Sequence, residues 1–227
     1  PAYRMYRDVE RNGIYVDIPA LHSVKKKYKD LEAEADKRLK ERYDINWNSS
    51  GQVAEVLFNK EGLSVIKKSE KTGKPSADAS VLKKLAAKGY DLPKMILDYK
   101  AANTLNKMFL NRWEDDLGTD KRIHPSFNLT NVVSGRTSCQ NPNLQQVPRT
   151  KDVRAIYKAP PGRLFFEADY SQLELRIAAD YSNDQTMLKI YNEGGDIHTT
   201  TAKLMTNGRE PTKEERGKAK AVNFGKV

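Results

Sequence analysis

The chain has 227 residues, which suits one large domain or two smaller ones. Of these residues 38% are hydrophobic and 31% charged, so a core can form but much of the surface must stay solvated. Its formal net charge of +10 favours a polyanionic partner. Nucleic acid is the first candidate and an acidic membrane surface the second, while a basic protein without such a partner is the third reading. Because no apolar run reaches membrane-spanning length and the start has no apolar signal core, we expect neither a membrane span nor a secretory signal.

Cysteine and histidine usage favours a reducing compartment and argues against a histidine metal site. Cys139 is the only cysteine, so an internal disulfide is impossible. The histidines, His22, His124 and His198, are scattered and lack metal-ligand spacing. We therefore expect an intracellular, cytoplasmic chain.

Two long amphipathic helices are predicted in the first half of the chain. Residues 3–16 predict a shorter helix that ends at Asn12-Gly13 and leads into an extended piece. From Leu21, and again from about Pro93, apolar residues recur in steps of three and four. The stripes are Leu21, Val24, Tyr28, Leu31, Ala35 and Leu39, and then Met95, Tyr99, Ala102, Leu105, Phe109 and Trp113. Matching stripes indicate an antiparallel pair.

The segment between these helices, residues 45–92, is polar and rich in lysine. Asn48-Ser49-Ser50 predicts the cap of a short helix at 52–58, and Pro75-Ser76 precedes another at 81–87. The loop between them carries Lys67, Lys68, Lys71 and Lys74. This loop is either a solvated insertion or a tip that rests on a phosphate backbone, and the composition favours neither reading.

After Trp113 the chain becomes rich in side chains that donate and accept hydrogen bonds. Residues 131–150 bury little and form either a plain surface loop or a polar contact surface. Arg136, Asn143 and Gln145 belong to the residue types that bind base edges or sugar-phosphate. Residues 153–157 and 164–168 are then predicted as two strands of a sheet, and the apolar run in the second predicts burial.

The stretch from Arg163 to Tyr181 predicts a carboxylate at the end of a strand, a tight turn and a helix. Asp169 ends the strand, and the helical spacing begins just after it. Ser171 and Glu174 fit the two halves of a capping box. A cation site is often built in this way.

The end of the chain predicts two more helices. Residues 193–196 predict a turn, with His198 at the head of the helix that follows. Thr212 and Glu215 predict a second capping box, after which Arg216, Lys220 and Phe224 recur at steps of four. Two cations on one helix face are usually just solvated. The Asn-Phe-Gly sequence at 223–225 argues against that reading here, because Phe and Gly are poor choices for an exposed helix interior.

Three segments in this order resemble the family A DNA polymerases. They are SGRTSCQNPNLQQVP at 134–148, DYSQLELR at 169–176 and RGKAKAVNFG at 216–225, the last two being similar to the family's first catalytic motif and the first part of its second. Leu173 stands where the family often has Ile. The resemblance extends over essentially the whole chain.

The resemblance implies an α+β fold: a long-helix thumb, a partial palm sheet and the first fingers helices of a right-hand polymerase, incomplete here. It divides the chain into 1–20, the edge of an upstream domain; 21–118, the thumb; 119–181, the first palm segment; and 182–227, the start of the fingers.

The same resemblance assigns roles to residues at the site. Asp169 would bind two Mg²⁺ ions together with the Tyr170 carbonyl, in the two-metal scheme of phosphoryl transfer. Arg216 and Lys220 would hold the triphosphate of the incoming dNTP and stabilise the leaving pyrophosphate, with Lys220 also catalytic. Phe224 would contact the sugar and base of the nucleotide, His198 would contact its phosphates, and Gln172 would support the site. Glu174 is either a cap or the side chain that closes the space of a ribose 2′-hydroxyl.

Template-primer DNA would be the second partner. Arg136, Asn143 and Gln145 would lie along its minor groove, where base-edge acceptors are nearly independent of sequence. Arg176 would support the primer terminus. The lysines of residues 67–74 would straddle duplex phosphate.

The resemblance also predicts a gap, because the family's His-Asp-Glu palm motif has no counterpart in these residues. One carboxylate cannot hold two metals, so the chain alone is expected to be inactive and to need a polypeptide with the rest of the fingers and palm. A naturally split or intein-interrupted enzyme and a truncated polypeptide both fit. The alternatives from other classes are a non-catalytic duplex-binding module and a single-subunit RNA polymerase, the latter disfavoured by Glu174.

Overall fold

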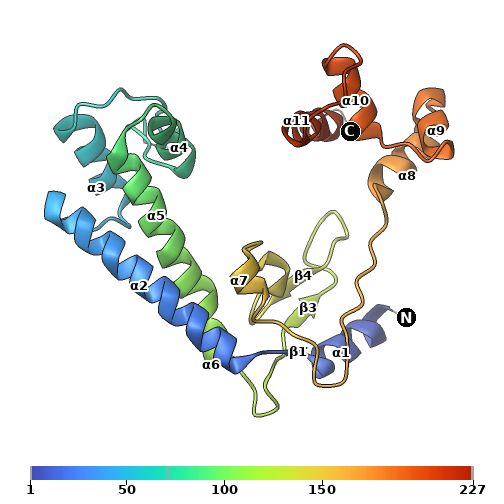
Figure 1. The fold of residues 1–227 in the computed structure, drawn as a ribbon, viewed down its shortest axis with the longest axis horizontal. Coiled ribbons are helices and arrows are strands. Elements are labelled where there is room, and N and C mark those ends of the chain that lie inside the picture. The colour runs from blue at the N-terminus through green and yellow to red at the C-terminus, as the bar shows by residue number, and fades with distance from the viewer. Residues whose placement is uncertain (1, 71, 226–227) are drawn as a thin grey trace. The chain divides into compact units, whose positions relative to one another are not determined.

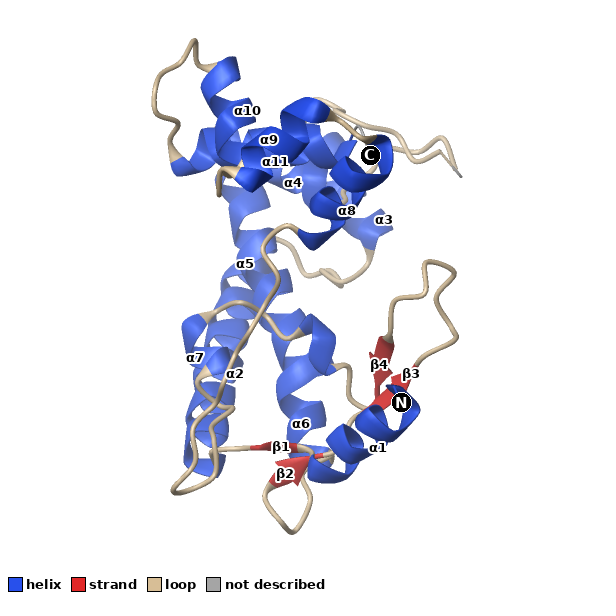
Figure 2. Cartoon of the chain, turned by 90° about the vertical axis from the view of Figure 1, so that its right-hand side faces the viewer, coloured by secondary structure: helices blue, strands red, loops and turns tan. Residues whose placement is uncertain are grey.

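The computed structural model describes residues 2–70 and 72–225, which form two compact units that meet between Phe165 and Phe166. Each unit is described by itself below. Helices dominate both, and the strands are confined to two short antiparallel pairs (Figure 2). No helix in the described ranges is long and apolar enough to cross a lipid bilayer. The predicted α+β class therefore holds, with little β-structure.

The first unit opens with a helix, α1 (Ala2–Asn12), that ends where Asn12-Gly13 predicted. Gly13 adopts a φ of +56°, and a Cβ there would lie 2.7 Å from the Ile123 carbonyl oxygen. Only glycine fits both the left-handed backbone and this close approach. The chain then enters β1 (Ile14–Tyr15), which pairs antiparallel with β2 (Arg122–Ile123).

The predicted antiparallel helix pair is confirmed (Figure 1). α2 (Ile18–Arg42) is capped by Asp17, whose side chain accepts a hydrogen bond from the Ala20 N–H. α5 (Asp91–Leu105) continues through a π-helical stretch, η2 (Asn106–Leu110), into α6 (Asn111–Asp115). Most of both stripes is buried or half-buried, whereas Leu31 is 45% exposed.

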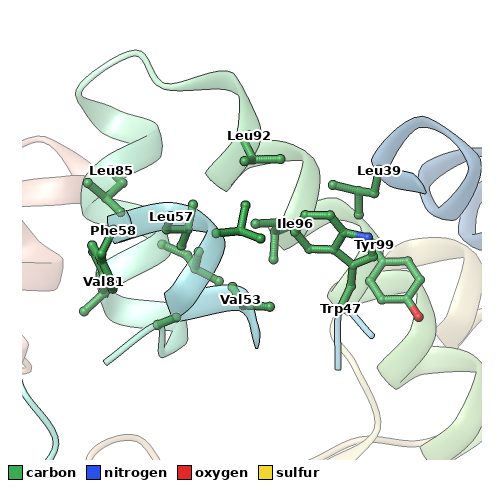
Figure 3. Packing of buried hydrophobic residues seen from close by; sticks show 13 residues of the cluster. Leu39, Trp47, Val53, Leu57, Phe58, Val81, Leu85, Leu92, Ile96 and Tyr99 are labelled. Atoms are coloured by element: carbon green, nitrogen blue, oxygen red, sulfur yellow. The ribbon is translucent and has the colours of Figure 1, made fainter. Parts of the chain in front are cut away.

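One core of the first unit lies at the far end of the helix pair. α3 (Ser50–Ala54), the π-helix η1 (Glu55–Lys60) and α4 (Ala79–Ala87) enclose it with α5. Figure 3 shows how Leu57, Leu85 and Ile96 meet there. The predicted cap is confirmed, because the Ser49 side chain accepts from the Gln52 N–H.

The second core of this unit lies near the opposite end and surrounds Trp113. β3 (Ser126–Asn128) pairs antiparallel with β4 (Ser138–Gln140), which leads to a 3₁₀ turn, η3 (Leu144–Gln146), and to α7 (Lys151–Arg154). The predicted strand at 153–157 is therefore wrong. Val153 and Ile156, both fully buried, lie three residues apart, so this segment buries one face of a helical turn. Within 153–157, Tyr157 alone forms an isolated β-bridge, with Val16.

The second unit is a cluster of four helices: α8 (Leu173–Ser182), α9 (Gln185–Asn192), α10 (Ile197–Met205) and α11 (Lys213–Gly225). Leu175, Ala179, Tyr191 and Ile197 form its core. The predicted buried strand at 164–168 is wrong. Leu164 and Phe166 are 94% and 92% exposed, because no described strand pairs with this apolar run.

Candidate active site and nucleic-acid interface

Asp169 and Tyr170 lie in an exposed segment without regular structure, immediately before a turn. The helix begins at Leu173, and its N-cap residue is Gln172 in a left-handed conformation with a φ of 56°. Ser171 is one position too early to cap it, so the predicted capping box with Glu174 is wrong. Glu174 is exposed in the first turn of α8.

The turn after Asp169 is held from α9 by a residue that the sequence did not single out. The Tyr191 hydroxyl donates to Gln172 Oε1 at 3.2 Å. The Arg176 guanidinium stacks 4.5 Å from the centre of the Tyr191 ring, while its Nε donates to the Ser171 carbonyl at 2.8 Å. Gln172 and Arg176 thus fix the backbone that follows Asp169.

The predicted second capping box is confirmed at the start of α11. The Thr212 N–H donates to Glu215 Oε2 at 2.7 Å, and the Glu215 N–H donates to Thr212 Oγ1 at 3.3 Å. The box fixes the first turn of α11, from which Arg216, Lys220 and Phe224 follow at steps of four on one face.

Arg216 is tied to the head of α10. Its Nη2 lies 2.5 Å from Asp196 Oδ2, and its Nε donates to Thr199 Oγ1 at 3.3 Å. Asp196 also caps α10, because Oδ1 accepts from the Thr199 N–H at 3.0 Å. Burial opposes ionisation of Asp196, but the hydrogen bonds from Arg216 and the Thr199 N–H outweigh it and lower the pKa of this carboxyl.

His198 lies beneath this cationic face and is only 3% exposed. Its ring centre is 5.6 Å from that of Phe224, and Lys220 Nζ is 5.8 Å from the Phe224 ring centre. Burial lowers the pKa of His198, with the charges of Arg216 and Lys220 acting in the same direction against Asp196. The imidazole is therefore neutral at pH 7.

The polar loop of the first unit is built around Cys139, which is buried. Its Sγ accepts from the Leu144 N–H at 3.4 Å. Asn143 caps the 3₁₀ turn through the Gln145 N–H, and Gln145 Nε2 donates to Thr137 Oγ1 at 3.0 Å. Gln145 and Arg136 are exposed and Asn143 is half-buried, so the structural bonds of Asn143 and Gln145 still leave these side chains accessible to a ligand.

The lysine-rich loop contains one lysine that is already paired. Lys67 Nζ lies 3.0 Å from the Asp78 carboxylate, which caps α4. Lys68 and Lys74 are exposed, and Lys71 lies outside the described residues.

Lys100 on α5 is a cation that the sequence did not single out. It is half-buried on an apolar pocket of about 550 Å³ that Leu97, Leu105 and Phe109 also line. Burial lowers the pKa of Lys100, and no ion pair or hydrogen bond to it exists within residues 2–70 and 72–225. A lysine that loses hydration without gaining a carboxylate is a candidate for an external anion.

Comparison with known proteins decides the family. The sequence matches DNA polymerase family A over residues 20–227. The chain belongs to DNA polymerase family A. It is 34% identical over 237 residues to the thermostable DNA polymerase I of Thermus filiformis, covering 99% of this chain and 28% of that protein. It is 33% identical to DNA polymerase I of Pseudomonas aeruginosa, covering 96% of this chain and 25% of that one.

A solved structure agrees with this family assignment. The POL domain of Pol1 from M. smegmatis, in complex with DNA primer-template and dNTP, superposes with a TM-score of 0.85 and 30% identity over 98% of this chain and 40% of that chain. The family A chain described here therefore spans only a fraction of the length of the proteins it matches.

Asp169 and Tyr170 are the residues that the sequence predicts as ligands of a metal ion. Asp169 and the Tyr170 carbonyl offer oxygen ligands of the kind that Mg²⁺ prefers. Within the described ranges, however, no group of three or more His, Cys, Asp or Glu side chains could hold an ion. Asp184, a nearby carboxylate in sequence, instead caps α9 through the Thr186 and Met187 N–H groups.

Proposed function

We propose that this chain is part of a DNA-directed DNA polymerase that adds deoxynucleotides to a primer 3′-hydroxyl in a template-directed reaction. Residues 21–118 form its thumb, 119–181 its first palm segment and 182–227 the start of its fingers, while 1–20 border an upstream domain. The observation that carries the proposal is the cationic face of α11, with Arg216 and Lys220 above the His198–Phe224 ring pair.

The triphosphate of a dNTP is the ligand that this face fits best. Asp196 and Thr199 engage Nη2 and Nε of Arg216, so its Nη1 remains for phosphate oxygens, and Lys220 adds a mobile point charge one turn away. Both cations stabilise the charge that develops on the leaving pyrophosphate. Phe224 is 42% exposed, which leaves ring surface for the sugar and base of the nucleotide.

Asp169 and the Tyr170 carbonyl would hold Mg²⁺ in the assembled enzyme. The ion, when bound, activates the primer hydroxyl and neutralises phosphate charge. The proposal assigns the second carboxylate to a further polypeptide with the rest of the fingers and palm, without which this chain would not extend a primer. Gln172 and Arg176 fix the turn beside Asp169.

DNA would contact the first unit. Arg136, Asn143 and Gln145 are proposed to lie along the minor groove of the template-primer duplex. Lys68, Lys71 and Lys74 would approach duplex phosphate, and Lys100 joins them because no anion pairs with it among residues 2–70 and 72–225. Lys67 contributes less, since Asp78 already neutralises it.

The test is primer extension by this chain mixed with a polypeptide that supplies the rest of the fingers and palm. Wild-type chain should extend the primer in the mixture and not alone, and extension by the chain alone would contradict the proposed missing carboxylate. Asp169→Asn should abolish extension and leave salt-sensitive duplex binding intact. Duplex binding without extension in any mixture would instead favour a non-catalytic DNA-binding module, for which the lysines and the polar loop suffice.

A further inference from the structure

A partly buried chain of hydrogen bonds links α10 and α11 beside the cationic face. The Thr201 hydroxyl donates to Asn223 Oδ1 at 3.0 Å, and Asn223 Nδ2 lies 3.0 Å from His198 Nδ1. Thr201 and Asn223 are half-buried and His198 is buried. None of the roles assigned above uses Thr201 or Asn223.

The direction of these bonds determines where the imidazole carries its proton. Asn223 turns its NH₂ group toward His198 Nδ1, and because an amide NH₂ group only donates, Nδ1 accepts in this arrangement and carries no proton. The ring is neutral, because burial and the charges of Arg216 and Lys220 lower its pKa more than Asp196 raises it. A neutral imidazole with a bare Nδ1 carries its hydrogen on Nε2.

The Nε2 atom of the buried ring keeps some contact with solvent and has no partner in the described residues. Nε2 has no hydrogen-bond partner among residues 2–70 and 72–225. It is also not among the side-chain atoms in those ranges that are enclosed without a partner, so it reaches the surface. His198 therefore offers one outward N–H donor beside Lys220 and Arg216.

We propose that Asn223, itself held by Thr201, is a positioning residue that fixes His198 as the Nε2–H tautomer so that it donates to a phosphate oxygen of the incoming nucleotide. This inference rests on the proposed function. Protonation of Nδ1 would set two donors against each other, so Asn223 also disfavours the imidazolium form. His198 thus supplies direction rather than charge, and Arg216 and Lys220 supply the charge.

The first test measures the tautomer directly. Long-range ¹H–¹⁵N spectra of the imidazole in this chain should show the proton of His198 on Nε2. Asn223→Asp has nearly the same shape but only accepts, so it should move the proton to Nδ1 and raise the pKa of His198. A wild-type ring protonated on Nδ1, or an Asn223→Asp ring unchanged from wild type, overturns the inference. A role in packing alone predicts no change in this isosteric variant.

The second test separates binding from chemistry in the assembled polymerase. Asn223→Ala should raise KM for dATP about tenfold, because a donor to phosphate is no longer oriented, with a smaller change in kcat. Thr201→Val should act in the same direction. Thr200→Val is the matched control, since among the described residues the Thr200 hydroxyl donates to the carbonyl of Asp196, the N-cap of the same helix.

The two tests keep the inference distinct from the function on which it rests. A functioning polymerase whose KM is the same in Asn223→Ala and Thr200→Val overturns only the role of Asn223. The other outcome is a chain that binds no dATP and supports no extension in any mixture, although His198 carries its proton on Nε2. That result overturns the proposed function and the phosphate contact together.

Discussion

A carboxylate between the two long helices is expected to hold their register. Glu32 on α2 accepts hydrogen bonds from Asn103 and, at 2.6 Å, from Asn106. Both amides are buried, at 7% and 2% exposed. Glu32→Ala removes the acceptor of Asn103, which costs about 1–3 kcal/mol for a buried donor left without a partner. Asn106 keeps the Tyr28 carbonyl at 3.0 Å, so its loss is smaller.

The expected decrease in the free energy of unfolding for Glu32→Ala is therefore about 2–4 kcal/mol. Urea unfolding followed by tryptophan fluorescence measures it selectively, because the two tryptophans, Trp47 and Trp113, both lie in the first unit. Glu34→Ala, on the same helix, is the matched control. Its ion pair with Arg38 is exposed, so its loss should cost less than about 1 kcal/mol. Equal costs for the two variants would refute the buried clamp.

Three further predictions concern DNA binding, pH and sugar choice. Lys100→Ala should weaken duplex binding and reduce the slope of log K against log salt by about 1, whereas Lys94→Ala, an exposed change on the same helix, should alter it less. The hydrogen bond from His124 Nδ1 to the Glu10 carbonyl raises the pKa of His124 above its ordinary 6.5. The resulting contribution to the free energy of unfolding is fully present below pH 6.5 and is lost as the pH rises through the raised pKa of His124. In His124→Gln, the free energy of unfolding measured at several pH values should no longer show this pH dependence. Glu174→Ala should increase ribonucleotide incorporation by the assembled polymerase, and unchanged sugar discrimination would exclude a role for Glu174 in sugar choice.

The helices were predictable because their signals are local. Asn12-Gly13, Ser49 and the Thr212–Glu215 box end or begin helices through bonds within a few residues of sequence. The apolar stripes likewise depend only on a period of 3.6 residues, and this is why the antiparallel pair could be predicted before its contacts were known.

The strands failed because a strand depends on a partner that a single segment cannot specify. The apolar run at 164–168 has a strand's composition but no described neighbour with which to pair. At 153–157 the apolar residues Val153 and Ile156 fit a helical turn as well as a strand. Ser171 failed as a cap by one position, within the usual uncertainty of helix ends.

The candidate site residues also divide into those with a local signal in the sequence and those that depend on contacts with another element. Asp169, Arg216 and Lys220 could be selected by charge and spacing alone. Tyr191 and Asn223 could not, because each acts on a residue of another helix, and that contact exists only once the helices pack. The sequence around a tyrosine or an asparagine in a helix does not indicate that its side chain will hold a residue of another helix.

The ion pair between Arg216 and Asp196 has a consequence for the thermodynamics of nucleotide capture. A free arginine side chain loses about 2 kcal/mol of rotamer entropy when it is immobilised. Two anchors, Asp196 and Thr199, restrict Arg216 in the folded chain before any nucleotide arrives. Folding therefore bears much of that entropic loss, and a triphosphate bound as proposed would meet a guanidinium whose direction is already set.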